Sequence, residues 1–183
     1  MSFFIWSRNL GKSEQGIIHN RYSVIPRVLI FLFDSPNSVL LIRGAKGKKL
    51  WAGKLNGIGG HVEKGESISQ AAERELLEET GLTCEKMLFC GQIIVDTGMD
   101  RGIAIFIFKA ENAKGKIKNS VEGIIEWHDV DALHADELVS DLPTLLLKVS
   151  QCQRGCQPFW GLYYYDENDE LVIPMRNKRI PIL

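Results

Sequence analysis

The pattern of apolar and polar positions predicts a chain built from several strands and two helices. Residues 24–33 (VIPRVLIFLF) are β-branched, aliphatic or aromatic almost throughout, which predicts a buried strand. A Ser-Pro-Asn-Ser turn follows at 35–38, so residues 39–42 are expected to pair back as a hairpin. Further strands are expected over 86–96, 103–110 and 124–128, with a polar loop at 112–119 and a terminal hairpin over 159–165 and 171–175.

A first helix is expected after Ser67, with clear start and stop signals. Ser67 is a favourable N-cap residue, and Gln70 three positions later completes a capping box. Gly81 follows Thr80 and suits the left-handed position that ends many helices. These signals place the helix over 68–80.

A second helix is expected over 142–153, with Pro143 at an early helical position. Asp141 precedes it as a possible N-cap, and a short helix is expected after Asp129. Two helices on a mixed sheet give the fold class α/β, arranged as a sandwich.

Length and composition are those of one ordinary globular domain. The 183 residues are 45% hydrophobic and 25% charged, which suffices for a sizeable core. Residues 1–21 form an N-terminal extension whose order the pattern leaves open, and 22–183 are expected to form a single domain. No apolar run reaches the roughly 18 residues of a membrane span. The pI near 6.4 argues against stable nucleic-acid binding, and the start lacks the basic segment of a signal peptide, so a cytoplasmic location is expected.

The four cysteines are Cys84, Cys90, Cys152 and Cys156. Cys152 and Cys156 are four positions apart, which could place them one helical turn from each other. No His–Cys spacing nearby completes a zinc pattern, so reduced structural thiols are expected.

The stretch 60–82 concentrates acidic residues in an almost neutral chain. Its charged residues are Glu63, Lys64, Glu66, Glu73, Arg74, Glu75, Glu78 and Glu79, a net charge of −4, whereas the whole chain carries −1. Because a helix turns about 100° per residue, Glu75, Glu78 and Glu79 fall within an arc of roughly 100°. Close carboxylates repel one another, and a divalent cation relieves that repulsion; an oxygen-only set suits Mg²⁺ or Mn²⁺. The alternative is a solvated acidic helix face with i,i+4 pairs.

The spacing of this stretch follows the pattern G-x5-E-x7-R-E-U-x-E-E-x-G-U, in which U is apolar. The matching residues are Gly60, Glu66, Arg74, Glu75, Leu76, Glu78, Glu79, Gly81 and Leu82. The chain therefore resembles the Nudix hydrolases, whose signature this pattern is. The resemblance implies an α/β/α sandwich with a mixed sheet, and a Mg²⁺-dependent enzyme that cleaves a diphosphate linked to another moiety.

The resemblance also implies roles for individual residues. Glu75, Glu78 and Glu79 would bind the metal together with the main-chain carbonyl of Gly60, and Arg74 would orient Glu78. These roles suit phosphoryl chemistry, which depends on charge neutralisation and on positioning.

The general base of the reaction is not fixed by the pattern. Glu78 or Glu79 could take the proton of the attacking water. Glu122 is another candidate, because its setting E-G-x-x-E-W resembles the loop of the MutT-type branch that supplies a further acidic ligand. A lone loop glutamate could equally be a solvated residue.

Three residues are candidates for binding the substrate. Asn56 precedes the sequence GIGG, an approach that resembles the 8-oxo-dGTP diphosphatases, in which an asparagine reads the purine edge. Asp141 either faces the base or caps the second helix, and the cap is the favoured interpretation. Arg43 opens a basic run that ends at Lys54, either a solvated loop or an attraction for a polyphosphate.

The preferred function is Mg²⁺-dependent hydrolysis of a nucleoside triphosphate, such as 8-oxo-dGTP, to the monophosphate and pyrophosphate. The enzymatic alternatives are ADP-ribose, a dinucleoside polyphosphate or NADH as substrate. The alternative from another class is a nucleotide-sensing module, which would be expected to lose carboxylates that this chain keeps. The expected partner is a small-molecule nucleotide, without stable nucleic-acid or membrane binding, and the expected state is a monomer or homodimer.

Overall fold

A mixed sheet with two helices organises the chain in the computed structural model, which describes residues 21–47, 51–118 and 122–174. The strands are β1 (Ser23–Ser35), β2 (Ser38–Gly44), β3 (Leu55–Asn56), β4 (Leu82–Asp96), β5 (Arg101–Gly115), β6 (Gly123–Asp129), β7 (Phe159–Tyr165) and β8 (Leu171–Val172). The helices are α1 (Ile68–Thr80) and α2 (Leu142–Ser150), with 3₁₀ turns at Val130–Ala132 and Ala135–Glu137.

The strands follow the order β3-β2-β1-β5-β4-β7-β8, and β6 pairs with β2. β1 runs parallel to β5, and β7 runs parallel to β4, while β4 and β5 form a long antiparallel hairpin. β2 pairs with β1 only near their connecting turn and then continues against β3, at Ile42 and Arg43. The residues after β3 are therefore placed beside β1, where the acidic stretch begins.

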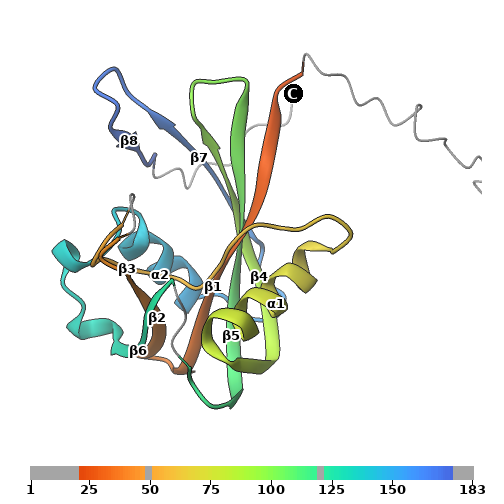
Figure 1. Ribbon diagram of the computed structural model, residues 1–183, viewed down its shortest axis with the longest axis vertical. Helices are drawn as coiled ribbons and strands as arrows, with labels where there is room; N and C mark the ends of the chain where they lie inside the picture. The colour runs from red at the N-terminus through yellow and green to blue at the C-terminus, as the bar shows by residue number, and fades with distance from the viewer. Residues whose placement is uncertain (1–20, 48–50, 119–121, 175–183) are drawn as a thin grey trace, which may run out of the picture.

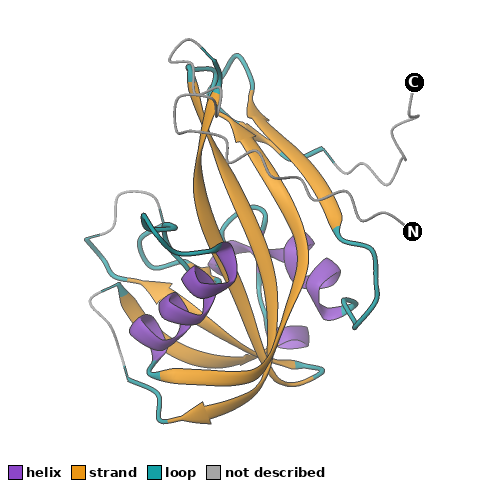
Figure 2. Ribbon diagram, turned by 90° about the vertical axis from the view of Figure 1, so that its right-hand side faces the viewer, coloured by secondary structure: helices purple, strands orange, loops and turns teal. Residues whose placement is uncertain are grey.

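The alternation of side chains along β1 divides the core into two layers. Val28, Ile30 and Leu32 belong to the apolar cluster that α1 completes, whereas Phe31 and Phe33 belong to the cluster that α2 completes. Figures 1 and 2 show the helices on opposite sides of the central strands. Each such fully buried side chain contributes about 1.5–3 kcal/mol relative to exposure. The two helices are thus fixed against one sheet from its two faces.

The α/β class and the mixed sheet are confirmed. Six of the ten predicted elements lie within about two residues of their expected bounds, whereas β4 begins four residues before its predicted start and β8 ends at Val172, before its predicted end. The predicted polar loop at 112–119 is wrong in its first part. β5 continues to Gly115 because its end pairs with the beginning of β4, where Leu82 faces Gly115. The predicted second helix ends at Ser150, three residues early. The predicted extension lies outside the described residues except for Arg21, and its separation from a single domain stays a prediction.

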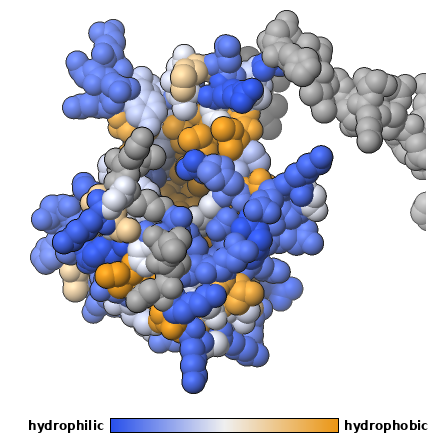
Figure 3. Space-filling model, viewed as in Figure 1, coloured by the Kyte–Doolittle hydropathy of each residue, from blue (hydrophilic) through white to orange (hydrophobic). Residues whose placement is uncertain are grey.

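Beyond the helices the central strands extend further, together with β7 and β8 (Figure 1). Figure 3 shows apolar side chains gathered in a hollow at the upper centre of this face, where the sheet leaves the helices. Trp160 and Leu162 on β7 are among the exposed large apolar residues of the chain.

Candidate active site

The acidic helix α1 begins and ends as its sequence predicts. The Ser67 hydroxyl accepts a bond from the Gln70 N–H (3.3 Å), and the Gln70 side chain accepts one from the Ser67 N–H (2.8 Å). Gly81 is left-handed (φ 75°) and donates its N–H to the carbonyl of Leu77. Ala71, Ala72 and Leu76 are buried against the sheet, which leaves the glutamates of the helix at its flank.

Residues 58–62 form a short extended segment that pairs antiparallel with residues 26–30 of β1. Ile58 exchanges two main-chain bonds with β1 (2.7 and 3.0 Å), the Gly60 carbonyl accepts one (3.0 Å), and the Val62 N–H donates one (3.1 Å). In such a pair, successive residues direct their main-chain groups alternately toward the partner strand and away from it. Gly59 and His61 are therefore the residues whose main-chain groups face away from β1.

Those two residues bond to α1 instead. The Gly59 N–H donates to Glu79 Oε2 at 3.1 Å, and the His61 carbonyl accepts from Arg74 Nη2 at 2.9 Å. Glu79 is 8% exposed, so its carboxylate is held at a nearly buried position. The segment thus fastens the acidic helix to the sheet through the glutamate and the arginine of the sequence pattern.

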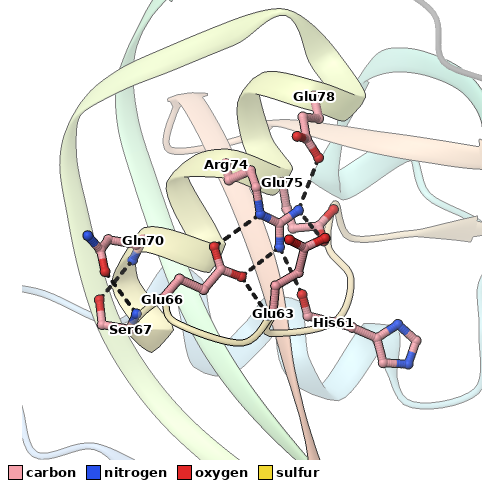
Figure 4. A network of polar contacts seen from close by, with 8 residues as sticks. All are labelled: His61, Glu63, Glu66, Ser67, Gln70, Arg74, Glu75 and Glu78. Carbon is pink, nitrogen blue, oxygen red and sulfur yellow. Dashed lines mark hydrogen bonds and ion pairs between the residues drawn. The ribbon is translucent and has the colours of Figure 1, made fainter.

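Arg74 is the centre of the carboxylate cluster (Figure 4). Its guanidinium binds both oxygens of Glu66 (2.8 and 3.1 Å), and its Nη1 donates to Glu75 (2.9 Å) and Glu78 (3.0 Å). The bond from Arg74 and a second from the Glu63 N–H hold the pKa of Glu66 below its usual value. Arg74 therefore gathers three carboxylates, including the predicted contact with Glu78.

Two glycines before α1 lie at close approaches to other parts of the chain. A Cβ on Gly59 would lie 2.1 Å from the carbonyl oxygen of Val28, which is main chain and cannot move aside. A Cβ on Gly60 would lie 2.3 Å from Glu75 Oε1. The Glu75 carboxylate therefore lies directly over Gly60, in space that only glycine leaves open.

The charge of this cluster fits a divalent cation. Glu66, Glu75, Glu78 and Glu79 carry four negative charges against the single positive charge of Arg74. All the side-chain donors are carboxylate oxygens, which suit hard cations. Within the part of the chain that the structure describes, no three acidic, histidine or cysteine side chains already converge as a complete metal site. In this arrangement Arg74 occupies the oxygens of Glu75 and Glu78 that face it.

The three predicted substrate residues lie around one residue of β3. Leu55 pairs with Arg43 on β2, and its carbonyl accepts a bond from the Val139 N–H at 3.1 Å. Asn56 follows Leu55 directly, and Asp141 comes two residues after Val139. Segments about 85 residues apart in sequence therefore meet at Leu55. Gly60, which lies against the carboxylate of Glu75, comes four residues after Asn56.

Arg43 and Asn56 are both engaged by neighbours. Arg43 lies 3.3 Å from a Glu126 oxygen and 3.7 Å from a Glu137 oxygen, and it donates to the Gly53 carbonyl. It belongs to the end of β2 and not to a solvated loop. The Asn56 side-chain oxygen accepts a bond from the Gly57 N–H at 2.8 Å, which fixes the orientation of the amide.

Asp141 occupies the predicted N-cap position of α2, and its carbonyl accepts a bond from the Leu145 N–H at 3.0 Å, but the predicted capping by its side chain is wrong. Asp141 precedes α2, but its side chain makes no capping bond. Its backbone (φ −93°, ψ −13°) is already helical, whereas a capping residue usually needs an extended backbone to fold its side chain over the first turn. Burial raises the pKa of the Asp141 carboxyl. Burial also raises the pKa of Tyr163, and the charge of Asp141 adds to that rise.

Glu122 immediately precedes β6, and its carbonyl accepts a bond from the Ala45 N–H at 3.1 Å. This places it at the same end of β2 as Arg43. The sequence did not indicate the pairing of Arg27 with His61, whose side chains meet at 3.2 Å (Arg27 Nε to His61 Nε2) beside the extended segment. Only the register between this segment and β1 brings them together.

The Nudix domain model matches residues 24–148, which is more than half of the chain. The chain belongs to the Nudix family. Two similar relatives are named oxidized purine nucleoside triphosphate hydrolase. The one from Danio rerio is 34% identical and covers 78% of this chain and 88% of its own length; the one from Mus musculus is 35% identical, with 67% and 81%.

Solved structures agree with this membership. A MutT protein from Bacillus halodurans has a TM-score of 0.67 and 25% identity, covering 81% of this chain and 94% of its own. A MutT Nudix hydrolase from Burkholderia pseudomallei (TM-score 0.59, 18% identity, 69% and 98% covered) shares the fold. The chain is a Nudix hydrolase, an enzyme class that acts on small-molecule nucleotides and generally needs a divalent metal. Neither helix among the described residues has the length and apolar character needed to cross a bilayer.

Proposed function

We propose that this Nudix hydrolase converts an oxidised purine nucleoside triphosphate, with 8-oxo-dGTP as the preferred substrate, to the monophosphate and pyrophosphate. The observation that carries the chemistry is the carboxylate cluster around Arg74, in which one guanidinium gathers Glu66, Glu75 and Glu78 while Glu79 bonds to the glycine-rich main chain beside them. The names of the zebrafish and mouse relatives, at 34% and 35% identity, support the choice of substrate.

We propose Mg²⁺ as the cofactor, with Mn²⁺ suited to the same oxygens. Glu75, Glu78 and Glu79 would hold it, and when bound it would neutralise phosphate oxygens and lower the pKa of a water. The main-chain ligand is better assigned to Gly59 than to Gly60. The Gly60 carbonyl bonds to β1, whereas the alternation of the segment directs the Gly59 carbonyl away from β1, as it does the N–H that bonds Glu79.

The reaction needs a group that takes a proton from the attacking water. The side chain of Glu78 is 60% exposed and tied to Arg74, so solvent water reaches it directly. Glu79 is nearly buried and bonded to the Gly59 N–H, and that arrangement favours a ligand role. Glu78 is therefore the proposed base, with Glu79 and Glu122 as the other candidates.

The residues around Leu55 would bind the nucleoside. Asn56 can make a bidentate contact to a purine edge, because an amide offers both a donor and an acceptor. Burial raises the pKa of the Asp141 carboxyl, so its protonated form, which can donate a hydrogen bond, persists to higher pH than in a free aspartate, and its ionised form can accept one. Arg43, held by two glutamates, positions this end of β2 and contributes positive charge. The cytoplasmic location and the monomeric or dimeric state stay predictions.

The proposal is tested by product analysis. The enzyme is incubated with 8-oxo-dGTP and Mg²⁺, and the products are separated by ion-exchange chromatography. Release of 8-oxo-dGMP and pyrophosphate in equal amounts, abolished by EDTA, is the expected result. Release of inorganic phosphate and a diphosphate would contradict the proposed position of cleavage, and turnover unaffected by EDTA would contradict the metal role.

A further inference from the structure

Two cysteine sulfurs meet just beyond the end of α2, on the side of the sheet opposite α1. Cys152 Sγ and Cys156 Sγ are 3.1 Å apart. The helix ends at Ser150, and a turn then closes through a bond from the Cys156 N–H to the Gln153 carbonyl (3.1 Å). Gly155 occupies the third position of this turn with φ 88°, the conformation that a type II turn reserves for glycine. The sequence CQRGC therefore folds so that its second cysteine returns to its first.

The two thiols differ in their access to solvent. Cys156 is exposed, whereas Cys152 is 5% exposed and belongs to the core cluster beneath α2. Cys90 on β4 is 1% exposed and lies in the same cluster. A small reagent can therefore reach the Cys156 thiol directly, whereas the Cys152 thiol is buried next to it.

The chemistry of the pair follows from its surroundings. A hydrogen bond from Cys152 lowers the pKa of Cys156, with smaller contributions from the Gln153 main chain and from the charge of Lys109. Lys109 Nζ lies 3.3 Å from the carbonyl of Cys152. Burial raises the pKa of Cys152 and of Cys90. The exposed thiol is thus also the one that ionises most readily, and the thiolate is the nucleophilic form.

We propose that Cys156 and Cys152 form a peroxide-oxidised dithiol site. The Cys156 thiolate attacks one oxygen of the peroxide, the O–O bond breaks, and the hydroxide that leaves takes up a proton to form water. The Cys156 sulfenic acid is then attacked by the Cys152 sulfur, which gives up its proton; the S–O bond breaks, and a second water leaves. Two thiols and one hydrogen peroxide thus give one disulfide and two waters, with two electrons passing from sulfur to the peroxide.

Cys84 provides the matched control within the chain. It is half-buried on β4 and packs against the other core cluster, the one that α1 completes. Burial raises the pKa of its thiol, with the charge of Glu73 as a smaller contribution. Cys84 is therefore expected to react with peroxide at least about tenfold more slowly than Cys156.

The chain allows a direct readout, because trypsin places each cysteine in its own peptide. Cleavage after Arg154 separates Cys152 (149–154) from Cys156 (155–176), while Cys90 falls in 87–101 and Cys84 in 75–86. The folded full-length protein is treated with hydrogen peroxide, its remaining thiols are alkylated, and it is digested without reductant. The expected product is peptide 149–154 joined to peptide 155–176, about 2 Da lighter than the two thiol peptides together.

Four variants test the two steps and their dependence on the turn. Cys152→Ser should leave a Cys156 sulfenic acid that dimedone traps, Cys156→Ser should leave Cys152 as a thiol, and Cys84→Ser should oxidise as the parent does. Gly155→Val should slow disulfide formation, because valine is strained at φ 88°. A Cys90–Cys152 disulfide as the main product, oxidation of Cys84 as fast as Cys156, or no joined peptide would each overturn the proposal. None of these outcomes depends on the nucleotide substrate.

Discussion

The contact between Gly60 and Glu75 gives the sharpest prediction for the site. In Gly60→Ala the new Cβ would lie 2.3 Å from Glu75 Oε1, whereas ordinary van der Waals contact begins at 3.4 Å. The Glu75 oxygen must therefore move by about 1.1 Å. A misplacement of about 1 Å in a catalytic arrangement costs roughly 10²-fold in rate, which corresponds to about 2.7 kcal/mol of activation free energy.

The fold should withstand the same change. The atoms that the new Cβ meets are the end of a flexible side chain, and Gly60 has no positive φ that alanine would avoid. Arg74 would keep its bonds to Glu66 and Glu78, so the loss of unfolding free energy should stay within about 1 kcal/mol. Gly59→Ala is the matched control: its Cβ meets the main chain of Val28, so it should lose about 1–3 kcal/mol of stability.

The assay is kcat/KM for 8-oxo-dGTP with Mg²⁺, measured beside urea unfolding of the same preparations. Gly60→Ala should lose activity and keep its stability, and Gly59→Ala should lose stability. Wild-type kcat/KM in Gly60→Ala would refute the inference that the position of Glu75 over Gly60 matters to the reaction. An unfolded Gly60→Ala protein would refute the inference that only a side chain has to move.

Three further substitutions test other parts of the account. Glu79→Gln keeps an acceptor for the Gly59 N–H but removes the charge of a proposed metal ligand, so kcat should fall by about 10²–10⁴-fold, or about 3–5 kcal/mol, while circular dichroism melting stays unchanged. Asp141→Asn tests the carboxyl whose pKa is raised in the folded chain. Because the folded chain binds this proton more tightly than the unfolded chain, the unfolding free energy of the wild type should fall as the pH rises from about 4 through the raised pKa. The variant should lack this fall when urea unfolding is compared at pH 4 and pH 7. Ser67→Ala removes one half of the capping box and should cost about 1 kcal/mol of unfolding free energy in the same assay.

Local signals in the sequence predicted the acidic helix, because its start and stop depend on neighbours within four residues. The hairpin of β1 and β2 and the strands β4 and β5 followed from apolar runs for the same reason. The parallel pairings of β1 with β5 and of β4 with β7 join segments far apart in sequence, and no local signal specifies them. For the same reason the sequence did not predict the ion-pair partners of Arg43, since Glu126 is 83 positions away.

Three features of the molecule differ from what the sequence predicted, each for a physical reason. A carbonyl ligand can be chosen only when the partner of each main-chain group is known, and Gly60 bonds to β1. Asp141 stands where a cap would stand, but its helical backbone directs the side chain elsewhere. The meeting of Cys152 and Cys156 depends on a turn after the helix, whereas the spacing alone suggested a helical turn.

The most direct test of the central claim is steady-state kinetics with Mg²⁺ on 8-oxo-dGTP, dGTP, dATP, ADP-ribose, a diadenosine polyphosphate and NADH. The account predicts that 8-oxo-dGTP has the highest kcat/KM by at least about tenfold, or about 1.4 kcal/mol in transition-state binding, and that Asn56→Ala narrows this preference. A higher kcat/KM for ADP-ribose, the dinucleotide or NADH would contradict the proposed substrate and the roles given to Asn56 and Asp141, while leaving the carboxylate cluster as the site of hydrolysis.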